Sequence, residues 1–142
     1  MRTAMPDKRK VKVGFRSWQE DGSVRRSEMP GELFRLNTGW ALTYIEEPDE
    51  NGVQANNTLF IRENELQLRR RGSILFEQKF RQGQLETGKM ETPYGLHGVQ
   101  ALTSLLDSEV SDSGGRVEWS YDLLMQDQKV GSFRIRLDIR EE

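Results

Sequence analysis

Residues 133–140 read Phe-Arg-Ile-Arg-Leu-Asp-Ile-Arg, and this alternation decides the fold of the chain. Side chains two residues apart lie on the same face of a β-strand, so the apolar side chains share one face and the charged ones the other. Val117 to Met125 alternate in the same way. With Gln126 to Gly131 as the connection, the two stretches predict an antiparallel hairpin that has one face in the core and one in solvent.

The same period of two occurs along most of the chain. Val11, Val13 and Phe15 share one face, and Asn51-Gly52 is a strong hairpin signal because both residues tolerate positive φ. Further strands are predicted at residues 39–47, 53–62, 65–71, 73–81 and 85–92. The connections are too short for crossover helices, so the strands form an antiparallel meander that curls into a barrel or splits into a sandwich. We expect an all-β, up-and-down barrel of about 8 to 10 strands.

The segment from Leu96 to Leu106 fits two patterns. Its apolar residues are spaced for a helix face, and a second set that begins at His97 is spaced for a strand. A single helix in a meander would leave two neighbouring strands with unpaired edges. The context therefore favours a strand.

Length and composition predict one domain and exclude several kinds of partner. The chain has 142 residues and a net charge of −2, so no overall positive field attracts nucleic acid or anionic lipid. No apolar run approaches the ~20 residues that span a bilayer. We expect a cytoplasmic protein with no nucleic-acid or membrane partner, in which a flexible basic arm at residues 1–10 precedes a barrel at residues 11–142. Its oligomeric state is left open.

Metal and cofactor chemistry has little support in the sequence. The chain contains no cysteine and a single histidine, His97, so a structural zinc site is excluded, and no phosphate-binding glycine motif occurs. Asp107, Glu109 and Asp112 are acidic and close in sequence, but a calcium loop needs glycine where Asp112 stands. We expect a solvated turn there, and neither a metal nor a cofactor.

Three polar residues fall on apolar strand faces. Arg70 shares its face with Leu66 and Leu68, Glu46 continues the face of Tyr44, and Gln78 lies on the face of Phe76. An unpaired buried charge is costly, so Arg70 is expected to pair with an acid such as Glu46, to bind a ligand, or to lie at the barrel mouth.

The stretch from Trp40 to Tyr121 resembles the YwiB-like or DUF1934 family of uncharacterised bacterial proteins. An ordered set of short motifs carries the resemblance: Leu42-Thr43-Tyr44-Ile45-Glu46-Glu47, Arg71-Gly72, Phe80 before Gly83, Thr92-Pro93-Tyr94-Gly95, and Gly115-Arg116-Val117 leading to Tyr121. The resemblance implies a calycin-type barrel, similar to lipocalins and fatty-acid-binding proteins. It implies no substrate, cofactor or catalytic residue.

Three functions follow as hypotheses. The first is a noncatalytic barrel that binds an anionic or amphipathic small molecule, oriented by Tyr44, Glu46, Arg70 and Tyr94. The second is a protein-interaction or structural domain whose barrel is filled by its own side chains. The third is an enzyme in which Glu46 and Tyr94 act as acid and base, and nothing in the sequence singles it out.

Overall fold

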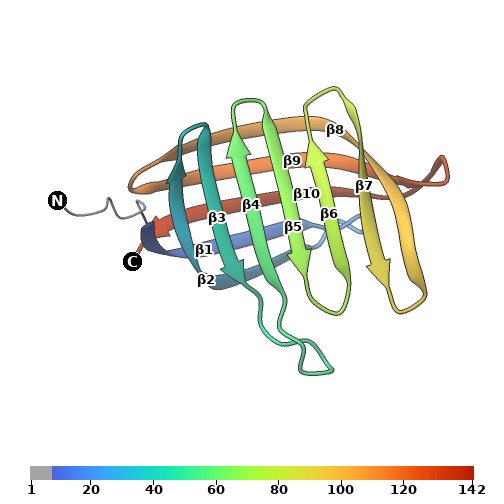
Figure 1. Ribbon diagram of the computed structural model, residues 1–142, viewed down its shortest axis with the longest axis horizontal. Coiled ribbons are helices and arrows are strands. Elements are labelled where there is room, and N and C mark those ends of the chain that lie inside the picture. Colours follow the sequence, from blue (N-terminus) through green and yellow to red (C-terminus); the bar gives the residue numbers. More distant parts are fainter. Residues whose placement is uncertain (1–7) are drawn as a thin grey trace.

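A computed structural model describes residues 8–142 of the chain, and these residues form ten β-strands and no helix (Figure 1). None of the described residues therefore belongs to a helix that could cross a membrane. The strands are β1 (Lys8–Trp18), β2 (Val24–Leu36), β3 (Gly39–Ile45), β4 (Asn56–Arg62), β5 (Glu65–Arg71), β6 (Leu75–Phe80), β7 (Leu85–Thr92), β8 (Gly95–Ser111), β9 (Gly114–Met125) and β10 (Gln128–Glu141). They close into an antiparallel barrel in which each strand pairs with its neighbours in sequence, and β1 pairs with β10.

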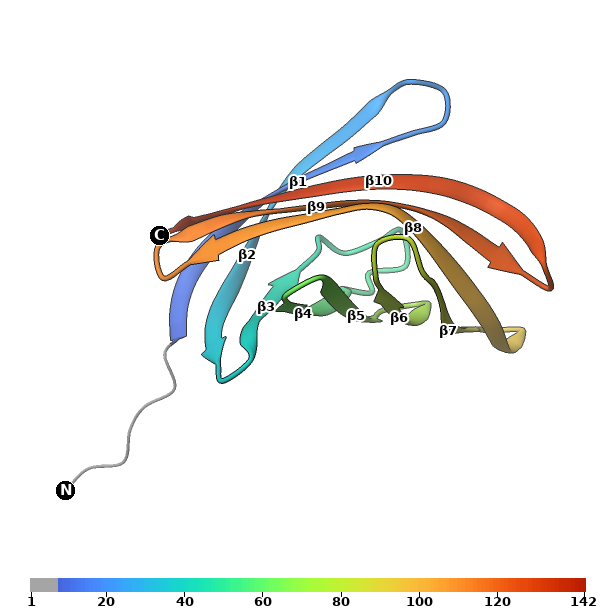
Figure 2. The same cartoon turned by 90° about the horizontal axis from the view of Figure 1, so that it is seen from above.

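The barrel is flattened into two layers. Figure 2 shows the long strands β8, β9, β10 and β1 above the shorter strands β3 to β7. Strand pairing is incomplete where the layers meet: β2 pairs with β3 only from Gly31 onward, and the ladder between β8 and β7 ends at Leu102. The barrel therefore opens at two mouths, one beside the first half of β2 and the other beside the second half of β8.

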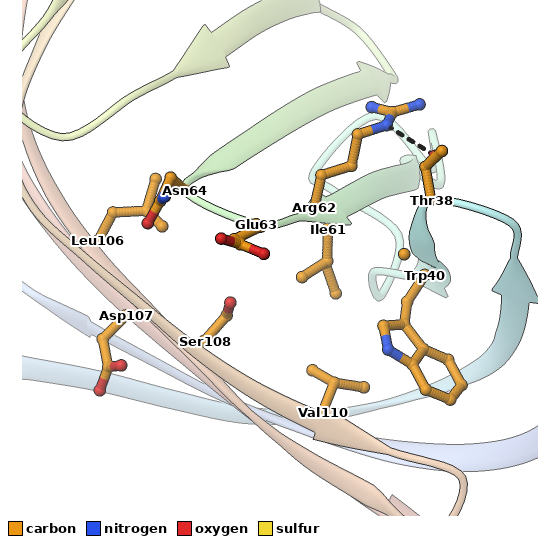
Figure 3. A pocket seen from close by; sticks show the side chains of 11 residues that line it. Thr38, Trp40, Ile61, Arg62, Glu63, Asn64, Leu106, Asp107, Ser108 and Val110 are labelled. Carbon is orange, nitrogen blue, oxygen red and sulfur yellow. Dashed lines mark hydrogen bonds between the residues drawn. The ribbon is translucent and has the colours of Figure 1, made fainter.

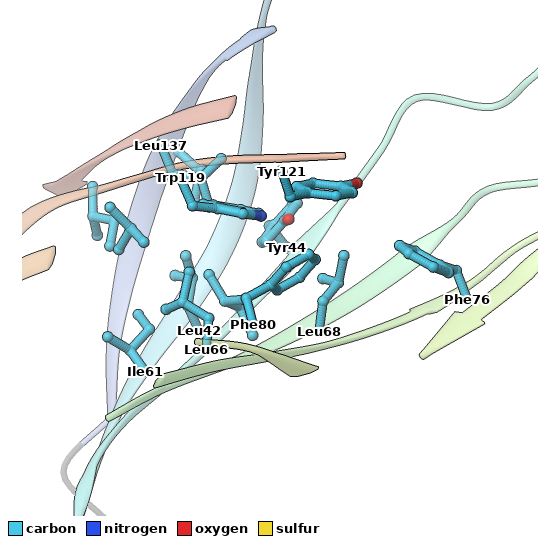
Figure 4. Close-up of a cluster of buried hydrophobic side chains, with 14 of the residues drawn as sticks. Leu42, Tyr44, Ile61, Leu66, Leu68, Phe76, Phe80, Trp119, Tyr121 and Leu137 are labelled. Atoms are coloured by element: carbon cyan, nitrogen blue, oxygen red, sulfur yellow. The ribbon is translucent and has the colours of Figure 1, made fainter. Parts of the chain in front are cut away.

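The centre of the barrel is filled by side chains from both layers. Trp119 on β9 is 1% exposed and lies 5.8 Å from the ring of Phe80, and the ring of Tyr121 lies 4.6 Å from Phe80 (Figure 4). Leu42, Leu59 and the other inward residues of β3 to β5 complete this core. Because its centre is occupied, the barrel has no continuous channel.

The predicted all-β barrel is confirmed. Leu96 to Leu106 lie within β8, as the edge argument requires, and the terminal hairpin forms with Gln126 and Asp127 as its turn. The predicted arm falls largely outside the described residues, because residues 1–7 are not described; Lys8 to Lys10 already belong to β1.

The sequence pattern did not indicate β2. Three of the six residues from Val24 to Met29 are charged, and Pro30-Gly31 resembles a turn signal. In the structure Pro30 lies where β2 still lacks β3 as a partner, so its missing N–H breaks no bond to β3.

Candidate ligand cavity

A cavity of about 500 Å³ occupies the mouth beside the first half of β2. β2 forms one wall, β9 and β10 form a second, and the inner face of β3 to β6 forms the third. Its apolar lining comes from Phe15, Met29, Leu68, Phe76 and Ile135, and its polar lining from Arg25, Ser27, Tyr44, Glu46, Glu47, Asn57, Arg70, Trp119 and Tyr121. The cavity therefore joins an apolar interior to a charged rim.

One cross-strand row provides most of the polar wall. Tyr44 on β3 lies opposite Asn57 on β4, Asn57 lies opposite Arg70 on β5, and Arg70 lies opposite Phe76 on β6. Directly opposed residues on one face of a sheet are near neighbours, so this register alone brings three polar side chains together. Glu46 follows β3 by one residue and reaches across β4 to the same group.

Arg70 and Glu46 form a two-pronged ion pair. Arg70 Nε donates to Glu46 Oε2 at 2.8 Å, and Nη2 donates to Oε1 at 3.1 Å. Asn57 Nδ2 also donates to Oε2 at 2.8 Å. The side chains of Arg70 and Glu46 are 32% and 33% exposed, so the pair lies at the barrel mouth rather than in the core. Both the predicted partner and the predicted mouth position are found.

Partial burial raises the pKa of Glu46, but the hydrogen bonds from Arg70 and Asn57 and the charge of Arg70 lower it by more. The pKa of Glu46 therefore lies below its ordinary value. The hydrogen bond to Glu46 raises the pKa of Arg70 in turn. At neutral pH the pair is ionised on both sides and contributes no net charge to the cavity.

Two tyrosine hydroxyls have no hydrogen-bond partner among residues 8–142. Tyr44 and Tyr121 are 4% and 6% exposed, both line the cavity, and burial raises the pKa of each phenol, so both stay protonated at neutral pH. Trp119 Nε1 is buried and likewise has no partner within this range. The rings of Tyr44 and Tyr121 are buried, but their hydroxyl oxygens are accessible from the cavity and give it an unused hydrogen-bonding capacity.

The loop between β3 and β4 is fixed over the rim. Asp49 Oδ1 accepts hydrogen bonds from the backbone N–H groups of Asn51 and Val53, and Ser73 Oγ, in the turn after β5, donates to Asp49 Oδ2 at 2.7 Å. These bonds tie the loop to the neighbouring turn. Glu46 and Glu47, at the start of the loop, are thereby held at the cavity.

Of the four predicted site residues, the structure brings three together. Tyr94 lies in the turn between β7 and β8, is 92% exposed and does not line the cavity. The proposed pairing of Glu46 with Tyr94 is therefore not formed. Asn57 is a site residue that the sequence analysis missed, although it has the same parity as the buried Leu59 and Ile61, which places it on the inner face.

Other polar residues of the sequence analysis lie elsewhere. Gln78 is buried, but its Nε2 donates to the backbone carbonyls of Lys79 and Glu86 beside the gap between β6 and β7. Asp107 and Glu109 both bond Arg116, at 2.7 and 2.8 Å. These side chains therefore form bonds within the sheet and do not line the cavity.

Comparison with known proteins gives a family but no activity. A family model described as "Domain of unknown function (DUF1934)" matches residues 12–137, which is most of the chain. The chain belongs to this family. The crystal structure of the ywiB protein from Bacillus subtilis is similar to it, with a TM-score of 0.83 and 18% sequence identity over 98% of this chain and 96% of that one. No curated protein matches.

The family assignment confirms the resemblance that the sequence motifs indicated. At 18% identity, the similarity to the ywiB protein shows the fold alone. Neither comparison assigns a ligand or a reaction, so the residues of the cavity carry the functional argument.

Disrupting the Arg70–Glu46 pair is expected to cost about 1 to 2 kcal/mol in the free energy of unfolding, less than for a fully buried pair because solvent screens it. Glu46→Gln and Arg70→Met should each destabilise, and the double variant should recover part of the loss. Urea denaturation of the four proteins measures this coupling. The looser pair of Arg69 and Glu77, 3.7 Å apart, is the control and should show almost no coupling. Additive losses at Arg70 and Glu46 would contradict the prediction.

Proposed function

We propose that the protein is a noncatalytic barrel that binds a small amphipathic molecule in the cavity at the β2 mouth. The unpartnered hydroxyls of Tyr44 and Tyr121, beside an apolar wall inside a cavity of about 500 Å³, are the observation that carries the proposal. Small-molecule sites in proteins have this composition: a mostly apolar concave surface with a few polar groups that fix orientation.

The chemistry of the lining favours an amphipathic ligand over a purely anionic one. Glu46 neutralises Arg70, and the remaining charges at the rim, Arg25 and Glu47, are of opposite sign. The ligand's apolar part would pack against Met29 and Phe76. Its polar group would exchange hydrogen bonds with the two phenols, which are neutral at physiological pH.

Native mass spectrometry of the purified protein tests for a ligand that copurifies. Solution binding is then measured by fluorescence with 1-anilinonaphthalene-8-sulfonate, an amphipathic probe, and by its displacement with decanol or decanoate. We expect saturable probe binding, and decanol should compete at least as well as decanoate. Stronger competition by decanoate would mean that the charge of Arg70 is available and the ligand is an anion.

A variant that fills the mouth locates the site. Ser27 is exposed and lines the cavity, so Ser27→Trp should obstruct it without disturbing the core. Thr87→Trp, on the outer face of β7, is the matched control. We expect Ser27→Trp to weaken probe binding roughly tenfold or more, which is about 1.4 kcal/mol, and Thr87→Trp to leave it unchanged. Equal binding by both variants would rule out this cavity as the site.

The filled centre of the barrel supports a second candidate, a protein-interaction domain. Trp119, Phe80 and Leu42 leave no internal space between the two mouths. Absence of any probe binding to the wild-type protein would favour this candidate over the first.

A further inference from the structure

The second half of β8 has an unpaired edge. The two-residue turn at Asp112 and Ser113 makes Ser111 and Gly114 a hydrogen-bonded pair of the ladder between β8 and β9. Because hydrogen-bonded pairs alternate, the backbone N–H and C=O groups of Ser108 and Val110 point away from β9. They have no hydrogen-bond partner among residues 8–142.

Neighbouring elements contact this edge on both sides of the gap. In the turn after β6, Gly83 N donates to Thr103 O at 2.7 Å, and Gln82 Oε1 accepts from Leu106 N at 3.0 Å. At the far end, Arg35 bonds the carboxylate of Asp112 at 2.9 Å. Between these contacts the edge is bare at Ser108 and Val110.

A groove of about 430 Å³ runs beside the bare edge (Figure 3). Trp40 and Ile61 line the side opposite Val110, and Glu63 and Asn64 lie opposite Leu106 and Ser108. The groove thus offers unpaired strand groups on one wall and an apolar surface with a carboxylate on the other.

The groove has one carboxylate without an ion-pair partner among the described residues, that of Glu63. The guanidinium of the neighbouring Arg62 pairs instead with the carboxylate of Glu65, at 3.8 Å. The carboxylate of Asp107 lies on the other side of β8 (Figure 3), where it pairs with Arg116 at 2.7 Å. A lysine or arginine side chain would complement the carboxylate of Glu63.

The other unpaired edge of the barrel is blocked, and the β8 edge is not. On β2, Pro30 has no backbone N–H to donate, and Arg26 and Glu28 are exposed charged residues on the stretch that does not pair with β3. Proline and exposed charges are features by which proteins prevent another strand from pairing with a sheet edge. On β8, Ser108 and Val110 are uncharged, and Glu109 is bound to Arg116.

We infer that the groove between β8 and the turn at Glu63 and Asn64 is a docking site for an extended segment of a partner protein that carries a basic residue. The segment adds a short strand to β8, with main-chain hydrogen bonds to Ser108 and Val110. An apolar side chain packs on Trp40 and Ile61, and the basic side chain lies by Glu63. The site is independent of the cavity at the opposite mouth.

The probe for this site is the peptide acetyl-Thr-Val-Lys-Val-Thr-amide, added to the full-length protein labelled with nitrogen-15. We expect hydrogen exchange at the amides of Ser108 and Val110 to be fast in the free protein and to slow roughly tenfold or more with peptide, while Arg26 and Glu28 on β2 stay unchanged. Fully N-methylated peptide, and a peptide with glutamate in place of lysine, should have no effect. Slow exchange at Ser108 and Val110 before peptide is added would show that the chain or a second copy already covers the edge, and would overturn the proposal.

Two proline variants test the assignment of the edge by stability as well as by peptide binding. Ser108→Pro removes a backbone N–H that does not bond β9, so the melting temperature of this variant should stay within about 3 °C of wild type. The protection that the peptide gives to the edge should be lost. Glu109→Pro removes a donor of the β9 ladder and should destabilise strongly. Equal destabilisation by both variants, or unchanged peptide binding by Ser108→Pro, would contradict the assignment of the edge.

Discussion

Replacing Trp119 with alanine is expected to lower the free energy of unfolding by about 3 to 5 kcal/mol. Its side chain is 1% exposed and is the largest of the fully buried ones, and it joins the packed centre of the barrel to the cavity. Its removal leaves a void bounded by Phe80 and by strands of both layers. These strands are held by their ladders and can collapse only partly, so the lost contacts are not regained.

Trp18 is the matched control for this change. It lies at the end of β1 with Arg134 over its ring at 4.4 Å, and a contact of this kind contributes about 0.5 to 1 kcal/mol. Trp18→Ala should therefore destabilise by about 1 kcal/mol. Urea denaturation followed by circular dichroism measures both. Similar losses for the two variants would mean that Trp119 is not a central element of the core.

The fold was predictable because its signal is local and repeated. Strands such as β5 and β10 bury every second side chain over part or all of their length, so parity identifies the inner face without knowledge of the partner strands. The segment from Leu96 to Leu106 required a different argument, because its own pattern is ambiguous. The requirement that neighbouring strands be paired decided it.

The strand β2 was missed for a physical reason. Between Val24 and Pro30 it pairs with β1 alone and covers little of the core; only Met29 is buried in this stretch. The alternation that reveals other strands is therefore weak, and Pro30-Gly31 resembles a turn. A strand segment that pairs on one side only and covers little of the core has no strong signature in its sequence.

The candidate site was predictable in part. The alternation of side chains along a strand places Tyr44 and Arg70 on inner faces. It does not give the register between strands, which puts Asn57 between them. No alternation argument placed Tyr94 on an inner face, and in the structure it lies in the turn before β8, with Gly95 at a φ of 126°. The residues from Thr92 to Gly95 reverse the chain between β7 and β8, which explains why Tyr94 does not line the cavity.

Gly31→Ala is expected to destabilise the protein by about 2 to 3 kcal/mol. Gly31 is the first residue of β2 to pair with β3, opposite Tyr44. A Cβ atom there would overlap the carbonyl oxygen of Thr43 and lie 3.3 Å from the Cβ of Tyr44. Because the obstacle is backbone, the strands must separate at the corner where the barrel opens.

Gly98→Ala is the control, because Gly98 is also a strand glycine but a Cβ there meets nothing within 4 Å. Its stability should be unchanged, or increased by about 0.4 to 1 kcal/mol through the lower entropy of the unfolded chain. Denaturation midpoints compare the two variants. The row from Tyr44 to Arg70 begins beside Gly31, so Gly31→Ala should also weaken probe binding to the cavity, whereas Gly98→Ala should not. If Gly31→Ala were as stable as wild type, the close approach of β2 to β3 would not hold in solution, and the wall that β2 gives the cavity would have to lie elsewhere.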